Sequence, residues 1–346
     1  MNFQQFKNNP YIFDQNHKKN FFDKIKKLTT HHKKNCREYK NFLNNYFVSN
    51  YKQLEDLPYI PTSVFKKFEL KSIKNDEITK RMISSGTTGK NSQIFLNNEN
   101  ALLQTKVLSQ LFRENVIKER VPMIILDRDP SLLKNSKITA RIAAINGFSI
   151  YGKHHTFLIK ENNEIDFDKF FKFISKYKDN KFIIFGFTSS VYDFFLKLEK
   201  IKNISLKNAV LLHGGGWKKL ESQKISNDKF RQNLKKKFKF SKIINYYGLI
   251  EQTGSIFFEC NEGYFHTSVY SDIYIRDEKL KLAHNKKKGL VQLISVLPTS
   301  YPGHNILTED IGAVYGIHNC KCGRLGKYFK IFGRAQGSEL RGCSNI

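Results

Sequence analysis

Short apolar segments alternate with segments of helical periodicity through the middle of the chain, and this alternation restricts the fold more than any other feature. Four apolar runs are bounded by glycine, proline or polar residues: VPMIILD (121–127), KFIIFGF (181–187), NAVLLH (208–213) and KIINYYG (242–248). Such runs are typical of buried strands. Residues 98–115 and 189–201 instead repeat their apolar side chains with the 3.6-residue period of a helix. We therefore expect an α/β fold in which helices cover a mostly parallel sheet.

The two ends of the chain depart from this alternation. The first 80 or so residues mix aromatic and basic side chains at helical spacing, as in NCREYKNFLNNYFVSNY (35–51). After about residue 256 the apolar segments become shorter and strand-like, as in GLVQLISV (289–296). We predict three parts: a helical segment at 1–80 packed on the main domain, a main domain at 81–333 that is β-rich from about 257 to 333, and a short tail at 334–346.

Basic residues outnumber acidic ones by 59 to 31, and the formal net charge is +28. A nucleic-acid-binding protein gathers such charge on one face or along one stripe. Here lysine and asparagine are scattered along the whole chain beside isoleucine and phenylalanine, which is typical of solvated surface positions. We therefore expect no specific nucleic-acid partner, although a basic nucleic-acid-binding protein without catalysis stays open as an alternative of another class.

The chain shows no sign of membrane insertion or export. No window approaches the roughly 18 apolar residues that cross a bilayer, and the first residues, MNFQQFKNNPYIF, lack the pattern of a signal peptide. We expect no transmembrane segment and a cytoplasmic location. The five cysteines are an odd number in such a chain, so metal binding or thiol chemistry is expected instead of a disulfide framework.

The segment SSGTTGK (84–90) has the composition of an anion-binding loop. Two glycines bracket two threonines, with two serines before them and a lysine after them. Backbone N–H groups, hydroxyls and an ammonium group can therefore converge on one anion, and phosphate is the natural guest. The spacing matches neither the Walker A motif nor the dinucleotide fingerprint. A polar turn between two strands stays open as the alternative.

Three later segments carry side chains that suit the rest of a nucleotide. NYYGLIEQTGS (245–255) has Glu251 three residues beyond Gly248, where a carboxylate suits Mg²⁺. TEDIG (308–312) has Asp310 at the expected edge of a strand, where it can accept hydrogen bonds from ribose hydroxyls. IFGRAQG (331–337) has Arg334 just past an expected strand, as a donor to phosphate or ribose oxygens. A turn or a surface ion pair is the alternative for each.

The order of these four motifs resembles the adenylate-forming superfamily of acyl-CoA synthetases, adenylation domains and luciferases. Ile250 stands where the superfamily has threonine, and Glu309 stands where it has glycine. A closer likeness, over about residues 60–346, is to the acyl-protein synthetases of the bacterial fatty acid reductase complex. It rests on FGFTSSVYDF (185–194), HGGGWKK (213–219), YYGLIEQTGSIF (246–257) and RGCS (341–344).

This resemblance implies an ATP- and Mg²⁺-dependent ligase that converts a fatty acid to acyl-AMP. The acyl group would then move to the protein's own Cys343 and on to a partner acyl reductase or acyltransferase. Catalytic roles fall to Cys343, Glu251 and Lys90, with Glu251 also binding Mg²⁺. The resemblance assigns the remaining ATP contacts as follows: Ser84, Ser85, Gly86, Thr87, Thr88, Gly89 and Lys90 to the pyrophosphate portion; Tyr247 and Gly248 to the adenine side; Asp310 and Arg334 to the ribose; and Gly214, Gly215 and Gly216 to the acyl or adenine pocket. For these last three glycines, a strand-to-helix turn is an equally good interpretation.

Twelve residues follow Arg334. We therefore expect the mobile C-terminal domain of the superfamily to be largely absent. A cysteine thiolate beside Gly342 on a short tail can attack an acyl-adenylate without a domain rotation. The alternatives are a frayed terminus that happens to contain Cys343, and an acyl-CoA or acyl-carrier ligase of the phenylacetate-CoA ligase type.

The remaining cysteines suggest a second site. Cys260 and His266 stand in CNEGYFH, and Cys320 and Cys322 stand in NCKCGR. Three sulfurs and an imidazole complete a tetrahedral Zn²⁺ site with no open position, so the site would be structural. A resemblance to phenylacetate-CoA-ligase-type relatives, which have a similar pairing at these places, implies the same ligand set. We expect Cys36 to be a small buried apolar residue. We expect His154 and His155 to lie in a surface turn, with a position facing the acyl pocket as the alternative.

Overall fold

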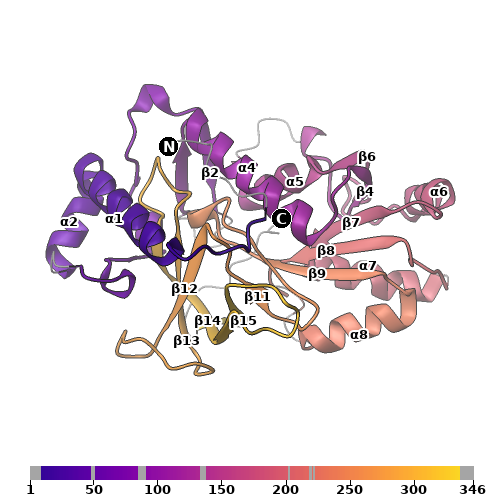
Figure 1. Ribbon diagram of the computed structural model, residues 1–346. Coiled ribbons are helices and arrows are strands. Elements are labelled where there is room, and N and C mark those ends of the chain that lie inside the picture. The colour runs from indigo at the N-terminus through magenta and orange to yellow at the C-terminus, as the bar shows by residue number, and fades with distance from the viewer. Residues whose placement is uncertain are drawn as a thin grey trace.

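The computed structural model describes residues 9–47, 51–84, 91–132, 138–201, 203–217, 220 and 223–335. Three sheets organise these residues, and helices lie on both sides of the central one (Figure 1). Among the described segments, no helix combines the length and the apolar character that crossing a bilayer requires.

The central sheet is the predicted parallel one. Its strand order is β10-β9-β8-β7-β4-β6, and all neighbouring pairs are parallel except β9 with β10. The chain passes from β4 to β6 on one side and then to β7 on the other side of β4, so the strand order reverses there. The strands are β4 (Val121–Ile125), β6 (Gly152–Phe157), β7 (Phe182–Phe187), β8 (Ala209–Gly214), β9 (Lys242–Tyr247) and β10 (Phe257–Phe258).

Helices bury both faces of this sheet. Alternate residues of β4 point to opposite faces: Met123 belongs to one buried cluster and Ile124 to another. The cluster around Met123 includes side chains of α4 and α5, and the cluster around Ile124 includes side chains of α6, α7 and α8. These helices are α4 (Asn98–Asn115), α5 (Ala140–Ser149), α6 (Phe167–Tyr177), α7 (Thr188–Ile201) and α8 (Asn227–Phe238).

A second sheet, mostly antiparallel, is built from the C-terminal part of the described chain. Its order is β11-β15-β14-β13-β12, and the short β1 (Ile60–Pro61) pairs in parallel with β14. The other strands are β11 (Phe265–His266), β12 (Ser271–Arg276), β13 (Gly289–Ser295), β14 (Asn305–Ile317) and β15 (Lys327–Arg334). A third sheet contains β2 (Lys80–Ile83), β3 (Gln93–Leu96) and β5 (Ile138–Thr139).

The N-terminal helices contact both large sheets. Phe21 and Ile25 of α1 (His17–Asn35) belong to the buried cluster on the parallel sheet. Tyr39 and Leu43 of α2 (Arg37–Tyr46) join the cluster under the second sheet, together with Cys36, which is buried as expected. A further short helix, α3 (Val64–Lys67), follows β1.

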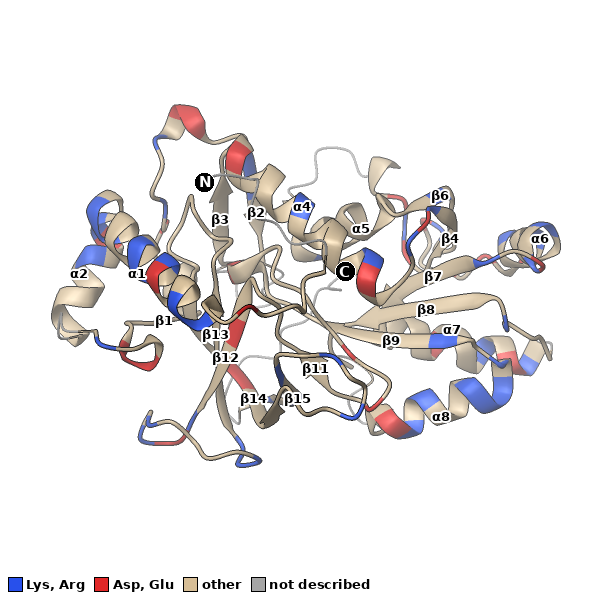
Figure 2. Ribbon diagram, in the orientation of Figure 1, with Lys and Arg blue, Asp and Glu red and all other residues tan. Residues whose placement is uncertain are grey.

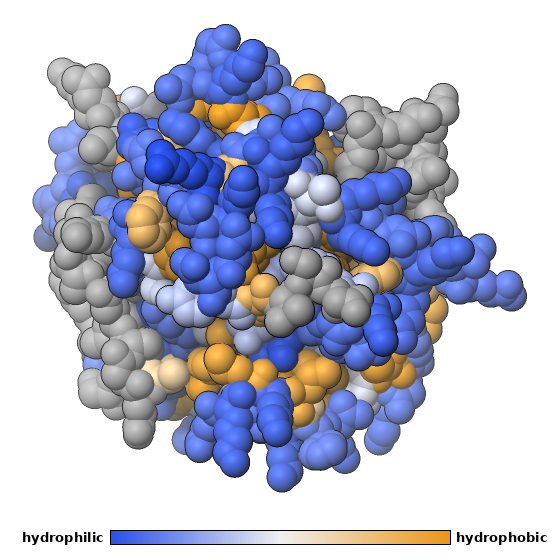
Figure 3. Space-filling view, turned by 90° about the vertical axis from the view of Figure 1, so that its left-hand side faces the viewer, coloured by the Kyte–Doolittle hydropathy of each residue, from blue (hydrophilic) through white to orange (hydrophobic). Residues whose placement is uncertain are grey.

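Lysine and arginine are spread over the molecule. Figure 2 shows them on α1 and α2 at one end and on α6 and α8 at the other. Figure 3 shows that the face carrying the N-terminal helices is mainly hydrophilic, with scattered apolar patches. The expectation that His154 and His155 lie in a turn is wrong, because both belong to β6, where they are exposed.

Candidate functional site

The predicted phosphate loop connects two antiparallel strands. Since β2 and β3 pair up to Ile83↔Gln93, residues 84–92 form the connection. Ser84 N–H donates to the carbonyl of Ser92 (2.9 Å), and Ser92 N–H donates to Ser84 Oγ (2.8 Å). Both serines are buried. The rest of the predicted loop lies outside the described residues: Ser85, Gly86, Thr87, Thr88, Gly89 and Lys90.

Glu251 lies against the base of this loop. It belongs to a short 3₁₀ turn, η6 (Ile250–Gln252), which follows β9, and it is 3% exposed. Ser92 Oγ donates a hydrogen bond of 2.6 Å to Glu251 Oε1. Burial raises the pKa of the Glu251 carboxyl, and the Ser92 hydrogen bond acts in the opposite direction. Carboxylate oxygen is a ligand type that Mg²⁺ prefers, so the donor chemistry of Glu251 fits this cation.

Ser92 was not among the residues identified from the sequence. It stands two residues beyond Lys90, outside the glycine-rich motif. The signal that finds it is the hairpin register, which brings Ser92 opposite Ser84.

Tyr247, Asp310 and Arg334 form one hydrogen-bonded group. The Tyr247 hydroxyl, at the end of β9, donates to Asp310 Oδ2 (2.6 Å). Asp310 and Arg334 are direct partners in the pairing of β14 with β15, and Arg334 Nε lies 3.5 Å from Asp310 Oδ1. Burial raises the pKa of Asp310, whereas the Tyr247 hydrogen bond and the charge of Arg334 act to lower it.

Two expected strand positions in this group are wrong. Asp310 lies inside β14, because that strand continues to Ile317, and Arg334 is the last residue of β15 instead of following it. Glu309 also belongs to the group, because Arg334 Nη2 donates to Glu309 Oε2 (2.9 Å). The side chain that stands in place of a glycine therefore forms an ion pair with the predicted ribose-binding arginine.

At two positions of the glycine run at the end of β8, the structure explains why the residue is glycine. A Cβ atom on Gly214 would lie 2.5 Å from the ring of Tyr246, and Gly215 has a φ of +79°. A Cβ atom on Gly216 would meet nothing within 4 Å. Gly248 is also confined, since its Cβ would lie 2.5 Å from Ile256 Cδ1.

The separate motifs meet in one region of the fold. Met82 of β2, Ile94 of β3, Ile250 of η6 and Ile306 of β14 belong to the same buried cluster. The charges of Arg334 and Asp310 also act on the carboxyl of Glu251. The structure therefore brings together Ser84, Tyr247, Glu251, Asp310 and Arg334, whereas Cys343 lies outside the described residues.

The four predicted zinc ligands also meet. The ligand atoms of Cys260, His266, Cys320 and Cys322 all lie within 4.8 Å of one another. Cys260 Sγ is 4.0 Å from Cys320 Sγ, and Cys322 Sγ is 3.4 Å from His266 Nε2. Two sulfurs bound tetrahedrally to one zinc ion at about 2.3 Å lie roughly 3.8 Å apart, so the set fits Zn²⁺.

The backbone around this cluster orients the ligands. Two tight turns present cysteines: Gly263 N–H donates to the carbonyl of Cys260, and Gly323 N–H donates to the carbonyl of Cys320, each at 3.0 Å. His266 Nδ1 lies 3.3 Å from the carbonyl of Leu325. A proton on Nδ1 donates to that carbonyl and leaves Nε2 for a metal. Burial lowers the pKa of His266 to about 4, which favours the neutral ring that binds metals.

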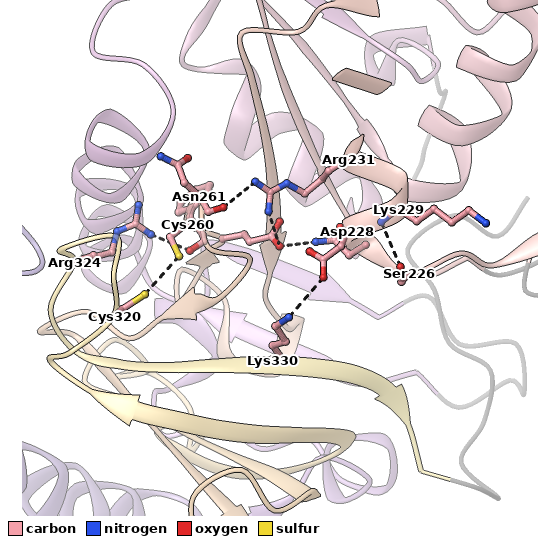
Figure 4. A network of polar contacts seen from close by, with 12 residues as sticks. Ser226, Asp228, Lys229, Arg231, Cys260, Asn261, Cys320, Arg324 and Lys330 are labelled. Atoms are coloured by element: carbon pink, nitrogen blue, oxygen red, sulfur yellow. Dashed lines mark hydrogen bonds and ion pairs between the residues drawn. The ribbon is translucent and has the colours of Figure 1, made fainter. Parts of the chain in front are cut away.

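Polar contacts join residues beside this cluster to α8, as Figure 4 shows. Arg231 of α8 donates to the carbonyl of Asn261 (3.3 Å) and lies 3.5 Å from Glu259 Oε1. Lys330 of β15 lies 3.8 Å from Asp228 in the first turn of α8. Residues that flank Cys260, together with Lys330 of the second sheet, thus contact a helix that covers the parallel sheet.

A family model described as acyl-protein synthetase, LuxE, matches residues 3–346. This chain belongs to that family. A long-chain-fatty-acid--luciferin-component ligase of Aliivibrio fischeri is 27% identical over 297 residues, which cover 82% of this chain and 76% of that protein. The ligase of the same name from Vibrio harveyi is 24% identical over 333 residues, covering 92% of this chain and 85% of that protein. The resemblance found in the sequence motifs is confirmed.

Solved structures confirm the fold of this LuxE-family chain. An open 2-hydroxyisobutyryl-CoA ligase in complex with 2-HIB-AMP and CoA aligns with a TM-score of 0.73 at 11% identity, covering 96% of this chain and 81% of that one. ATP-bound MatB from Rhodopseudomonas palustris aligns with a TM-score of 0.51 at 12% identity, covering 76% and 49%. The chain has the adenylate-forming fold, and it is a ligase of that type.

Proposed function

We propose that this chain uses ATP to activate a fatty acid as its acyl-adenylate. The acid's carboxylate oxygen attacks the α-phosphorus of ATP, the bond to pyrophosphate breaks, and acyl-AMP forms. The observation that carries the proposal is the hydrogen bond of Glu251 to Ser92 at the base of the glycine-rich loop, near enough to Asp310 and Arg334 for their charges to act on it. The fatty acid as substrate is supported by the names of the Aliivibrio fischeri and Vibrio harveyi relatives.

Different residues of the chain would bind different parts of ATP. Glu251 would hold Mg²⁺, which when bound neutralises phosphate charge. Asp310 would accept from the ribose hydroxyls beside Arg334, and Tyr247 with Gly248 would face the adenine. Ser84 and the loop that follows it would contact the pyrophosphate portion, and Lys90 would supply the positive charge. Gly214, Gly215 and Gly216 would border the acyl or adenine pocket.

Exchange of radiolabelled pyrophosphate into ATP tests this activation step. The exchange should require both a fatty acid and Mg²⁺. Exchange that proceeds equally without any fatty acid would contradict the proposed substrate.

Cys343 is the proposed acceptor of the acyl group. Its thiolate sulfur attacks the carbonyl carbon of acyl-AMP, the bond between that carbon and the phosphate oxygen breaks, and AMP leaves with both electrons. The resulting thioester would pass the acyl group to a partner acyl reductase or acyltransferase. RGCS (341–344) and membership of the acyl-protein synthetase family support this step.

Labelling with radioactive fatty acid and ATP tests the acceptor, with Cys343→Ser as the decisive variant. The wild-type chain should retain label through denaturation, and the variant should not, while both sustain pyrophosphate exchange. Equal labelling of the two proteins would contradict self-acylation. Release of the activated acyl group only when coenzyme A is added would favour a coenzyme A ligase.

We also propose that Cys260, His266, Cys320 and Cys322 bind one structural Zn²⁺. The ligand spacing and the Leu325 carbonyl behind His266 support this proposal. Since the four protein ligands complete a tetrahedron, the ion would have no position left for a substrate.

A further inference from the structure

Ser92 is a fully buried residue with contacts on two sides. Its hydroxyl donates to Glu251 Oε1 at 2.6 Å. Its backbone N–H and carbonyl bond to Ser84 at 2.8 and 2.9 Å. Ser84 and Ser92 flank residues 85–90 of the phosphate loop, so one residue joins the base of that loop to the carboxylate of Glu251.

The backbone beneath Glu251 is fixed by other contacts. Gln252, the next residue of η6, donates from Nε2 to the carbonyls of Leu293 (3.2 Å) and Gly303 (2.9 Å). A Cβ atom on Gly303 would lie 2.4 Å from the carbonyl oxygen of Glu251. A backbone hydrogen bond of Glu251 also acts on its own carboxyl group. With the main chain held in this way, the bond from Ser92 is the contact that ties this carboxylate to the strand after the loop.

We propose that Ser92 is a positioning residue for nucleotide-bound Mg²⁺, an inference that rests on the proposed function. Its hydroxyl holds the Glu251 carboxylate in the orientation that meets the cation, and its backbone fixes Ser92 itself against Ser84. Ser92 itself contacts neither the metal nor the nucleotide. Residues that orient a metal ligand in this way typically change metal affinity or activity by about 10- to 100-fold when they are replaced.

Ser92→Ala isolates the side-chain contact. The substitution removes the hydroxyl but keeps both backbone hydrogen bonds to Ser84. Calorimetric titration with ATP, with and without Mg²⁺, is the measurement. We expect Ser92→Ala to weaken binding of Mg²⁺·ATP by about 10- to 100-fold and to leave binding of metal-free ATP unchanged. Ser92→Thr, which keeps a hydroxyl, should restore most of the Mg²⁺-dependent affinity.

Ser295→Ala is the matched control. Ser295 is also fully buried, and its hydroxyl accepts an equally short bond from Ser255 Oγ (2.6 Å). Its loss should lower the free energy of unfolding without changing the effect of Mg²⁺ on ATP binding.

Two results would overturn the role of Ser92. One is wild-type affinity of Ser92→Ala for Mg²⁺·ATP. The other is an equal loss of affinity with and without Mg²⁺, since that pattern belongs to a purely structural residue. Because the readout is binding, a wild-type chain that binds Mg²⁺·ATP but lacks fatty-acid-dependent exchange would contradict only the proposed function. A wild-type chain that binds no ATP under either condition would contradict both.

Discussion

The hydroxyl of Tyr247 donates a 2.6 Å hydrogen bond to Asp310, which joins the end of the parallel sheet to the middle of the second sheet. Arg334 contacts the other oxygen of the same carboxylate. The residues proposed for the adenine and the ribose are therefore in contact before any nucleotide binds. A ribose hydroxyl that bonds to Asp310 has to share this carboxylate with Tyr247.

Tyr247→Phe should lower the free energy of unfolding by about 1.5–3 kcal/mol, because it removes a hydrogen bond to a buried charged group. Urea unfolding monitored by circular dichroism measures this change. Tyr315→Phe is a suitable control, since no hydrogen bond of its hydroxyl lies within the described part of the chain. Equal stability changes in the two variants would contradict the importance of the Tyr247–Asp310 bond.

Glycine substitutions distinguish a turn from a pocket at the end of β8. Gly214→Ala places a methyl group against the Tyr246 ring, and overpacking of this kind costs about 1–3 kcal/mol. Gly216→Ala meets open space and should change the unfolding free energy by less than about 0.5 kcal/mol. If Gly216 borders a ligand, its alanine variant should raise the KM for ATP or fatty acid at unchanged stability. Unchanged kinetics would favour the turn interpretation.

A stacked pair of buried histidines makes one contribution to the pH dependence of stability. His32 and His304 stack with ring centroids 4.9 Å apart; His32 contacts Ser72 and the Pro298 carbonyl, and His304 contacts Thr29. Burial lowers the pKa of His304 to about 3 and that of His32 well below its ordinary value.

The sign of this dependence follows from proton uptake. Below about pH 6.5 the unfolded chain binds protons that the folded chain excludes. The contribution of these two histidines to stability should therefore be complete above that pH and fall as the pH drops toward 3, by up to about 1.4 kcal/mol per pH unit for each histidine. Urea unfolding at pH 7 and pH 5 measures the effect. His304→Gln should reduce the difference between the two pH values, whereas His284→Gln, at an exposed position, should not. An unchanged difference in His304→Gln would contradict this explanation.

Metal analysis tests the cysteine–histidine cluster. Purified wild-type protein should contain about one equivalent of zinc, and Cys320→Ala should contain little. The variant should also unfold at a lower temperature, because metal binding to a folded site adds to folding stability. Cys36→Ala, which removes a buried cysteine outside the cluster, should keep its zinc. Zinc below about 0.2 equivalents in the wild-type protein would contradict the site.

Local patterns predicted the strands whose side chains are buried on both faces and the helices with one buried apolar face. The apolar runs at 121–127 and 181–187 became β4 and β7, and the periodic segment 98–115 became α4. β6 was not predicted, because its sequence, GKHHTF, is mostly polar and its middle residues are exposed. An edge strand with solvent on one side carries no continuous apolar run.

The sequence predicted several residues of the candidate site, but it did not predict which of them contact one another. Glu251, Asp310 and Arg334 could be identified because each stands in a short motif. The pairing of Arg334 with Glu309, and the bond from Ser92 to Glu251, depend on strand registers between residues far apart in the sequence. Those registers are set by packing of whole sheets, and no local spacing reports them.

Pyrophosphate exchange in wild-type protein and in Glu251→Gln is the most direct measurement of the proposed activity. The substitution keeps the size of the side chain but removes the charge that would bind Mg²⁺. The wild-type chain should incorporate labelled pyrophosphate into ATP only when a fatty acid is present, and the variant should be slower by about 100-fold or more. Exchange by Glu251→Gln at the wild-type rate would contradict the proposed role of Glu251. No exchange by the wild-type chain with any fatty acid of a straight-chain series would contradict the proposed activation of a fatty acid.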